Sequence, residues 1–172
     1  MHSEIEAAVR SLSTTGAAIR TLASDLSYSE ARWKPAPDRW SVLEVVNHLA
    51  DEEAEDFRAR LDILLHRPDT EFAPIDPPGW VTHRAYAERD MADSLDRFDL
   101  ERARSLAWLA KIQAAALGNT REHPRLGTMS GRQMLASWIA HDLLHVRQIA
   151  RLRYESLAER VGQTSIEYAG NW

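Results

Sequence analysis

The chain has 172 residues and a formal net charge of −5, and it contains no cysteine, which excludes disulfides, thiolate metal ligands and a cysteine nucleophile. The length suits one domain spanning residues 1–172 with a sizeable core, and the interspersed acidic and basic residues argue against nucleic-acid binding. No apolar run approaches the ~20 residues of a membrane span, and the first residues do not resemble a signal peptide, so we expect a cytoplasmic protein that does not bind membranes.

The first element is predicted to be an amphipathic helix over residues 3–27. Its apolar residues recur at helical spacing and would form one buried face. They are Ile5, Val9, Leu12, Ile19, Leu22 and Leu26. Pro35 and Pro37 interrupt any helix in the following stretch, so residues 27–39 are expected to be a connection.

The second helix has a capping box at its start. In Ser41-Val42-Leu43-Glu44 the Ser41 hydroxyl can accept a hydrogen bond from the Glu44 N–H, while the Glu44 carboxylate accepts one from the Ser41 N–H. The apolar pattern continues to about residue 65, and His48 lies at the border of the buried face. Residues 66–82 contain four prolines and are expected to be a long connection that lines a site.

A third helix is predicted over about 85–117 and a fourth from a second capping box, Ser130 with Gln133, to about residue 154. Residues 155–172 are expected to hold one short helix and an irregular tail, and no segment has a convincing strand pattern. The predicted fold is therefore an all-α four-helix bundle with long loops, a core of about 3–154 and a short C-terminal extension, 155–172.

Two histidines of the last predicted helix, His141 and His145, are four residues apart and therefore share one face. They lie within an apolar stripe and are expected to point inward, where they can bind one metal ion. Of the other five histidines, only His48 lies within a predicted helix and near its buried face. Those in termini, junctions or loops are His2, His66, His83 and His123.

Three imidazoles around one divalent ion would leave coordination positions open, as in catalytic sites. At ~1.5 Å per residue, His48, His141 and His145 lie about 10, 16 and 22 Å beyond their helix caps, and in a bundle with staggered ends they can lie at the same height. The pair can equally be two solvated or core histidines. A di-iron bundle is excluded because no glutamate here has a histidine three residues later.

Other polar residues are weaker candidates. Glu52, four residues after His48, can orient an imidazole or act as a base, although a solvated position is the more common outcome. Gln148 can bond a ligand imidazole or a substrate. Asp142 is expected to be exposed or paired with a neighbouring helix. Three arginines near the last helix, Arg121, Arg125 and Arg132, can bind a substrate carboxylate, and nothing in the sequence selects among them.

Three segments resemble motifs of the DinB-like superfamily of metal-binding four-helix bundles, which includes YfiT-type bacillithiol transferases and mycothiol-dependent maleylpyruvate isomerases. Trp40-Ser41-Val42-Leu43-Glu44-Val45-Val46-Asn47-His48-Leu49 resembles the family's W-S/T-x-x-E-x-x-x-H-L. His123-Pro124-Arg125-Leu126-Gly127 is similar to the family's loop before the last helix. His141-Asp142-Leu143-Leu144-His145-Val146-Arg147-Gln148-Ile149 resembles H-x-x-x-H-x-x-Q-I.

The resemblance implies that His48, His141 and His145 bind one divalent ion, often nickel or zinc. It also implies a metal-dependent enzyme acting on a small molecule, either a transferase with a low-molecular-weight thiol cosubstrate or a hydrolase. The alternative is a non-catalytic bundle that binds metal or dimerises. Exposed apolar faces of such bundles commonly pair, so we expect a homodimer.

Overall fold

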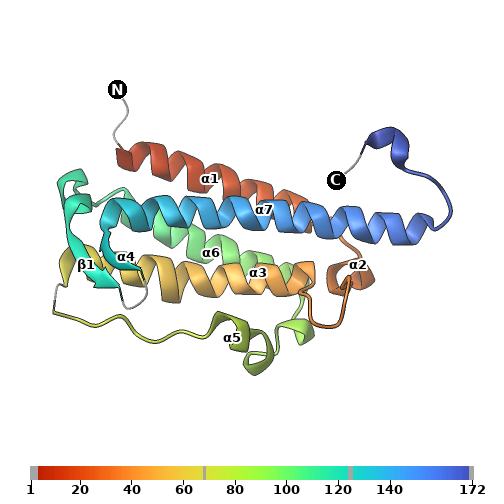
Figure 1. Cartoon of the computed structure of the whole chain (residues 1–172), viewed down its shortest axis with the longest axis horizontal. Coiled ribbons are helices and arrows are strands. Elements are labelled where there is room, and N and C mark those ends of the chain that lie inside the picture. The colour runs from red at the N-terminus through yellow and green to blue at the C-terminus, as the bar shows by residue number, and fades with distance from the viewer. Residues whose placement is uncertain (1–3, 68, 124–125, 171–172) are drawn as a thin grey trace.

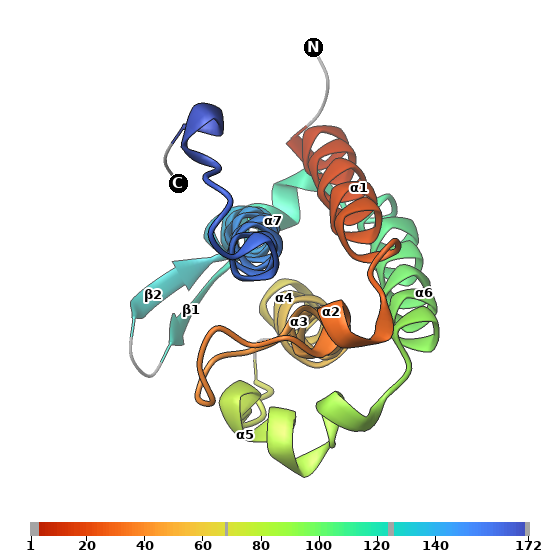
Figure 2. The same ribbon diagram turned by 90° about the vertical axis from the view of Figure 1, so that its right-hand side faces the viewer.

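Four long helical segments form a bundle in the computed structural model, which describes residues 4–67, 69–123 and 126–170. They are α1 (Glu4–Ala23); α3 (Val42–Asp51), continued by the π-helix η1 (Glu52–Phe57) and α4 (Arg58–His66); α6 (Met91–Leu109); and α7 (Gly131–Val161). In Figure 1, α1 and α7 run in one direction, while α3–α4 and α6 run in the other. Figure 2 shows the four segments end-on. The predicted four-helix bundle is confirmed.

Shorter elements occupy the connections. Helix α2 (Tyr28–Arg32) lies in the first connection, α5 (Pro77–His83) in the proline-rich one, and the 3₁₀ turns η2 (Tyr86–Glu88), η3 (Ala114–Gly118) and η4 (Glu167–Ala169) elsewhere. Strands β1 (Thr120–His123) and β2 (Gly127–Ser130) form an antiparallel hairpin in which Thr120 pairs with Ser130. The prediction of no strand was therefore wrong, because four-residue strands are too short to show a clear alternating pattern.

Some helices begin or end at other residues than predicted. The third long helix starts at Met91 rather than near residue 85, and α7 continues to Val161 without a break near residue 154. The expected extension from residue 155 therefore begins only after α7 ends. None of the helices in the described part of the chain combines the length and apolar character that a bilayer crossing requires.

Both predicted capping boxes are present. Ser41 N–H donates to Glu44 Oε2 at 2.7 Å, and Glu44 N–H donates to Ser41 Oγ at 3.3 Å. Ser130 and Gln133 make the same exchange at 2.8 and 3.2 Å. Each box satisfies backbone N–H groups that the first turn of a helix leaves without partners. The caps thereby fix where α3 and α7 begin and which residues face inward.

The interior contains two apolar clusters with a buried polar layer between them. One cluster includes Leu12, Leu61 and Trp138, and the other includes Ile19, Val46, Phe98 and Ile149. The polar layer is built around Arg102, whose Nη2 lies 2.9 Å from Glu53 Oε2 and whose Nη1 lies 2.6 Å from Asp142 Oδ2. All three charged side chains are buried, so each is paired where unpaired charge would be costly.

Candidate metal centre

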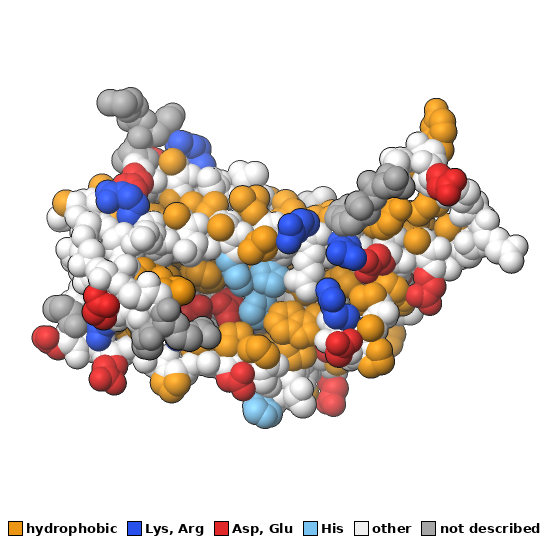
Figure 3. Space-filling view, viewed as in Figure 1, with side chains coloured by type: hydrophobic (Ala, Val, Ile, Leu, Met, Phe, Trp, Pro, Cys, Tyr) orange, Lys and Arg blue, Asp and Glu red, His pale blue; other side chains and the backbone are white. Residues whose placement is uncertain are grey.

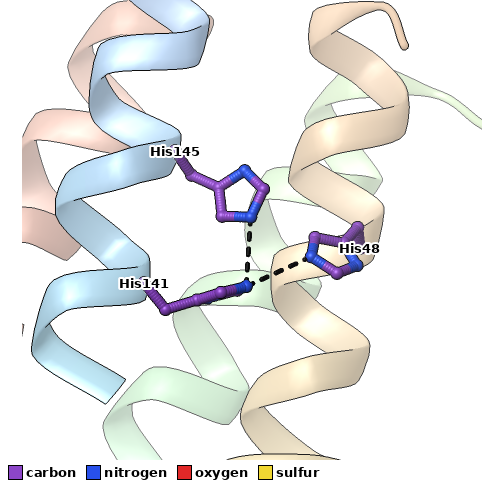
Figure 4. A group of neighbouring side chains, drawn as sticks. All are labelled: His48, His141 and His145. Atoms are coloured by element: carbon purple, nitrogen blue, oxygen red, sulfur yellow. Dashed lines mark hydrogen bonds between the residues drawn. The ribbon is translucent and has the colours of Figure 1, made fainter. Parts of the chain in front are cut away.

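Three histidine side chains from two helices converge on one point (Figure 4). His48 comes from α3, and His141 and His145 come from α7. The Nε2 atom of His141 lies 3.4 Å from Nε2 of His48 and 3.1 Å from Nε2 of His145. One nitrogen from each of the three rings lies within 4.8 Å of the others. The structure therefore brings together the three histidines that the sequence singled out.

Their common level follows from the antiparallel arrangement of α3 and α7 (Figure 1). The N-terminal caps of α3 and α7 lie toward opposite ends of the bundle. His48 and the histidine pair of α7 can therefore lie at the same height along the bundle although their distances from the caps differ. The pair on α7 is separated by one turn, which places both rings on the side facing α3, where they meet edge to face. Trp40, just before the α3 cap, packs against His48 with ring centroids 4.8 Å apart.

All three imidazoles are held in the neutral form. Burial, followed by the proximity of the other two histidines, lowers the pKa of His48 to about 2. Burial and His145 lower the pKa of His141 to about 3, and burial lowers that of His145 as well. A neutral imidazole keeps a nitrogen lone pair, which is the form that binds metal ions.

A hydrogen bond orients one of these rings. His145 Nδ1 donates to Gln148 Oε1 at 2.8 Å, which leaves the lone pair of His145 on Nε2, the atom that faces the other histidines. Such partners fix the tautomer of a ligand imidazole. His48 Nδ1 has no hydrogen-bond partner among the described residues, and the nearest carboxylate oxygen is Glu52 Oε1 at 3.9 Å.

Two of the three nitrogen separations fit a metal ion. A tetrahedral ion with imidazole nitrogens at about 2.0–2.1 Å holds them about 3.3 Å apart, close to the 3.1 and 3.4 Å separations at His141. Without an ion, a single shared proton could join only one pair of nitrogens. The unoccupied lone pairs would then face each other in a buried site, which is unfavourable.

Glu52 is buried beside the histidines, not solvated. The π-helix η1 begins at this residue, and its wider turn directs Glu52, Glu53 and Phe57 inward together. Burial, followed by the negative charge of Asp56, raises the pKa of Glu52 to about 8. Close to neutral pH, this carboxyl group can therefore both hold and release a proton.

Two hollows open beside the histidines. One, of about 530 Å³, is lined by His141, His145, Gln148 and three arginines. The other, of about 650 Å³, is lined by Glu52, by Phe57 and by residues of the proline-rich connection and the hairpin. The Phe57 ring lies 4.9 Å from that of His141. Figure 3 shows histidine side chains at the surface with Lys and Arg side chains close to them on one side, while Asp and Glu side chains lie on both sides.

The remaining candidates lie elsewhere. Asp142 was expected to be either exposed or paired with a neighbouring helix. It is buried and pairs with Arg102 of α6. Arg132 pairs with Glu4, and Arg121 contacts the Arg67 carbonyl group and Phe72. His2, Pro124 and Arg125 lie outside the described residues.

Sequence reasoning did not identify Glu53 and Arg102 as a buried pair or the three arginines beside the histidines. Glu53 follows Glu52 directly, and a regular helix would not be expected to bury both. Two of the arginines, Arg147 and Arg151, lie one turn apart on α7 close to the histidine pair, and this spacing was an available signal.

Comparisons with known proteins agree with this fold. Bacillus subtilis YfiT, described as "a probable metal-dependent hydrolase with an unusual four-helix bundle topology", has a TM-score of 0.78 at 19% identity, over 95% of this chain and 92% of that one. A conserved Enterococcus faecalis protein has a TM-score of 0.68 at 16% identity, over 92% and 99%. No curated protein gives a sequence match. A sequence profile of the DinB superfamily matches residues 11–149, and the chain therefore belongs to that superfamily.

Proposed function

We propose that this protein is a metal-dependent hydrolase whose single divalent ion is held by His48, His141 and His145. The observation that carries the proposal is the convergence of three neutral imidazoles, one buried and two half-buried, beside a hollow large enough for a small molecule. The similarity in fold to a probable metal-dependent hydrolase supports it. The alternative of a non-catalytic bundle would call for histidines sealed from solvent, whereas His141 and His145 line a hollow.

The ion and the protein have separate roles in this proposal. A divalent ion held by the three imidazoles would lower the pKa of a bound water to about 7 and so would supply a nucleophile near neutral pH. Gln148 holds the His145 ring so that Nε2 faces the centre. Glu52 lies beside His48 and would take up or hold a proton there, since burial raises its pKa to about 8. Trp40 packs on His48 and limits its rotation.

The donor set favours nickel or zinc. Imidazole nitrogen suits both ions, while the lack of cysteine excludes a thiolate site and the lack of a carboxylate ligand within the histidine group disfavours magnesium and calcium. A thiol-dependent transferase is the second candidate. Because the chain has no cysteine, the thiol would come from a small cosubstrate, and the same ion would favour its thiolate form.

The test is metal analysis of protein purified without a histidine tag, followed by activity screens. We expect about one nickel or zinc ion per chain in the wild type and less than a tenth of that in His145→Ala. His66→Ala is the matched control, because His66 is an exposed histidine on α4 whose contact is with Asp62. Equal metal content in wild type and His145→Ala would refute the proposal.

Two activity screens separate the candidates. The metal-loaded protein is assayed for hydrolysis of chromogenic aryl esters, and separately for transfer of cellular low-molecular-weight thiols to a chromogenic aryl halide. Turnover of esters without thiol supports the hydrolase. Turnover that needs an added thiol supports the transferase instead. If a chelator reduced neither activity, a catalytic metal would be excluded.

A homodimer remains a proposal. Leu143 of α7 is 55% exposed, which leaves apolar surface on that helix that a second copy can cover. Sedimentation equilibrium tests it, and a monomer at concentrations near 100 μM would exclude it. We also propose a small-molecule substrate and no nucleic-acid partner, given the net negative charge.

A further inference from the structure

The hollow that exposes His141 and His145 also gathers three guanidinium groups. Arg147 and Arg151 lie on the same side of α7 as Gln148, and Arg39 faces them from the connection before α3. None of the described residues that line this hollow has a carboxylate side chain. The chain as a whole has more acidic than basic residues, 26 against 21, so the concentration of positive charge is local and does not reflect composition.

Two of these arginines have no charged partner in the described part of the chain. The side chains of Arg39 and Arg147 make no hydrogen bond or ion pair there, while Arg151 contacts Glu155 at 2.7 Å. Most other arginines of the bundle are paired, for example Arg58 with Glu101 and Arg84 with Glu55. Like charges brought together without a counterion repel one another, so this arrangement favours the arrival of an anion.

Local structure fixes Arg39 beside the histidines. Its backbone N–H donates to the Ala36 carbonyl oxygen at 3.0 Å, which closes a turn. The next residue, Trp40, packs on the His48 ring. The position of Arg39 therefore depends on the same contact that holds one of the three histidines, and a group bound by Arg39 and Arg147 lies next to the metal centre.

We propose that this arginine hollow binds an anionic group of the substrate, a carboxylate or a phosphate, and so selects acidic small molecules. The proposal rests on the proposed function, because it assigns the substrate class of that same site. Guanidinium groups bind both kinds of oxyanion through paired N–H donors. The hollow, at about 530 Å³, is large enough for such a molecule.

The experiment is calorimetric titration of the metal-loaded protein with benzoate, phenyl phosphate and uncharged benzamide. We expect at least one anion to bind wild type about tenfold or more tightly than benzamide. In Arg39→Gln/Arg147→Gln, that anion should bind about tenfold more weakly, as expected when hydrogen bonds to a charged group are lost. Whichever of benzoate and phenyl phosphate binds more tightly shows whether the hollow prefers a carboxylate or a phosphate.

Arg10→Gln is the matched control, because Arg10 is an exposed arginine on α1 that is not among the residues lining the hollow. It should bind the anions as wild type does. A metal ion attracts anions by itself, and that attraction stays in the double variant, so the difference between wild type and double variant isolates the arginines. All three substitutions are at exposed positions, and thermal unfolding checks that the variants fold.

The outcomes separate the two proposals. Metal content measured on each sample reports on the histidine site alone. If wild type carried no metal, the proposed function would fail, while the same titrations on the metal-free protein would still report on the arginines. Equal affinity of wild type for anions and benzamide, or unchanged anion affinity in the double variant, overturns the arginine proposal whatever the metal content.

Discussion

Arg102 and Asp142 form a two-point ion pair in the interior of the bundle, with Nη1–Oδ2 at 2.6 Å and Nη2–Oδ1 at 2.9 Å. Asp142 is the neighbour of His141 in sequence, and Arg102 comes from α6 on the opposite side of the core. The pair thus connects the helix that supplies two histidines to the rest of the bundle. Trp138, one turn before His141, adds a hydrogen bond to Glu53 at 3.1 Å.

Removing one partner of this pair should strongly destabilise the fold. In Asp142→Ala the Arg102 charge stays buried with only Glu53 beside it, so we expect a loss of about 3–5 kcal/mol in the free energy of unfolding, measured by urea denaturation. Asp96→Ala, which removes an exposed partner of Arg20, should cost less than about 1 kcal/mol. Equal losses in the two variants would contradict the assignment.

Metal removal should lower stability without unfolding the protein. An ion that binds only the folded state at a free concentration 100 times its Kd adds about 2.7 kcal/mol. We expect a chelator to lower the unfolding midpoint of wild type and to leave His48→Asn unchanged. His83→Asn changes an exposed histidine of α5 and should respond to the chelator as wild type does. An identical response of all three proteins would exclude His48 as a ligand.

Gln148 should tune metal affinity through His145. Without the acceptor at 2.8 Å, the His145 ring can rotate and change tautomer, so Gln148→Ala should bind the ion about 10–100-fold more weakly. Competition with a chromogenic chelator measures this. Gln148→Glu retains an acceptor and should recover most of the affinity. Gln163→Ala, at an exposed residue beyond α7, serves as the control.

Glu52 should affect turnover more than metal content. A group that transfers a proton in the reaction contributes about 10²–10⁴-fold, so Glu52→Gln should lower kcat by that range while the ion stays bound. The readout is the ester or thiol-transfer assay together with metal analysis. Glu55→Gln is matched to it, because Glu55 is an exposed glutamate of the same π-helix that pairs with Arg84. A kcat unchanged by Glu52→Gln would rule out proton transfer by this residue.

The α3 cap should contribute measurably to stability. Ser41→Ala removes the oxygen that accepts the Glu44 N–H, and such changes cost about 1 kcal/mol. Ser13→Ala, in an exposed position within α1, should be neutral or slightly stabilising because alanine favours helices. Chemical denaturation compares the two. A Ser41→Ala variant as stable as Ser13→Ala would show that the capping box contributes little.

Some structural features of this protein could be predicted from the sequence because they depend only on residues close together in the chain. The caps at Ser41 and Ser130 depend on residues three positions apart, and the pairing of His141 with His145 depends on one helical turn. The apolar periodicity of the long helices, and hence the bundle, is local in the same sense. His48 was identified because it lies near the buried face of a capped helix.

Other features depend on contacts between distant segments, which only the tertiary structure decides. Whether His48 and His141 lie at the same height in the bundle depends on the relative direction and offset of α3 and α7. Glu52 and Asp142 are buried because other elements cover them, although glutamate and aspartate usually remain exposed. Arg39 lines the arginine hollow because the end of the first connection lies beside α7, more than a hundred residues later in the chain. Sequence periodicity indicates which side of a helix is buried, but the packing of the helices determines which side chains meet there.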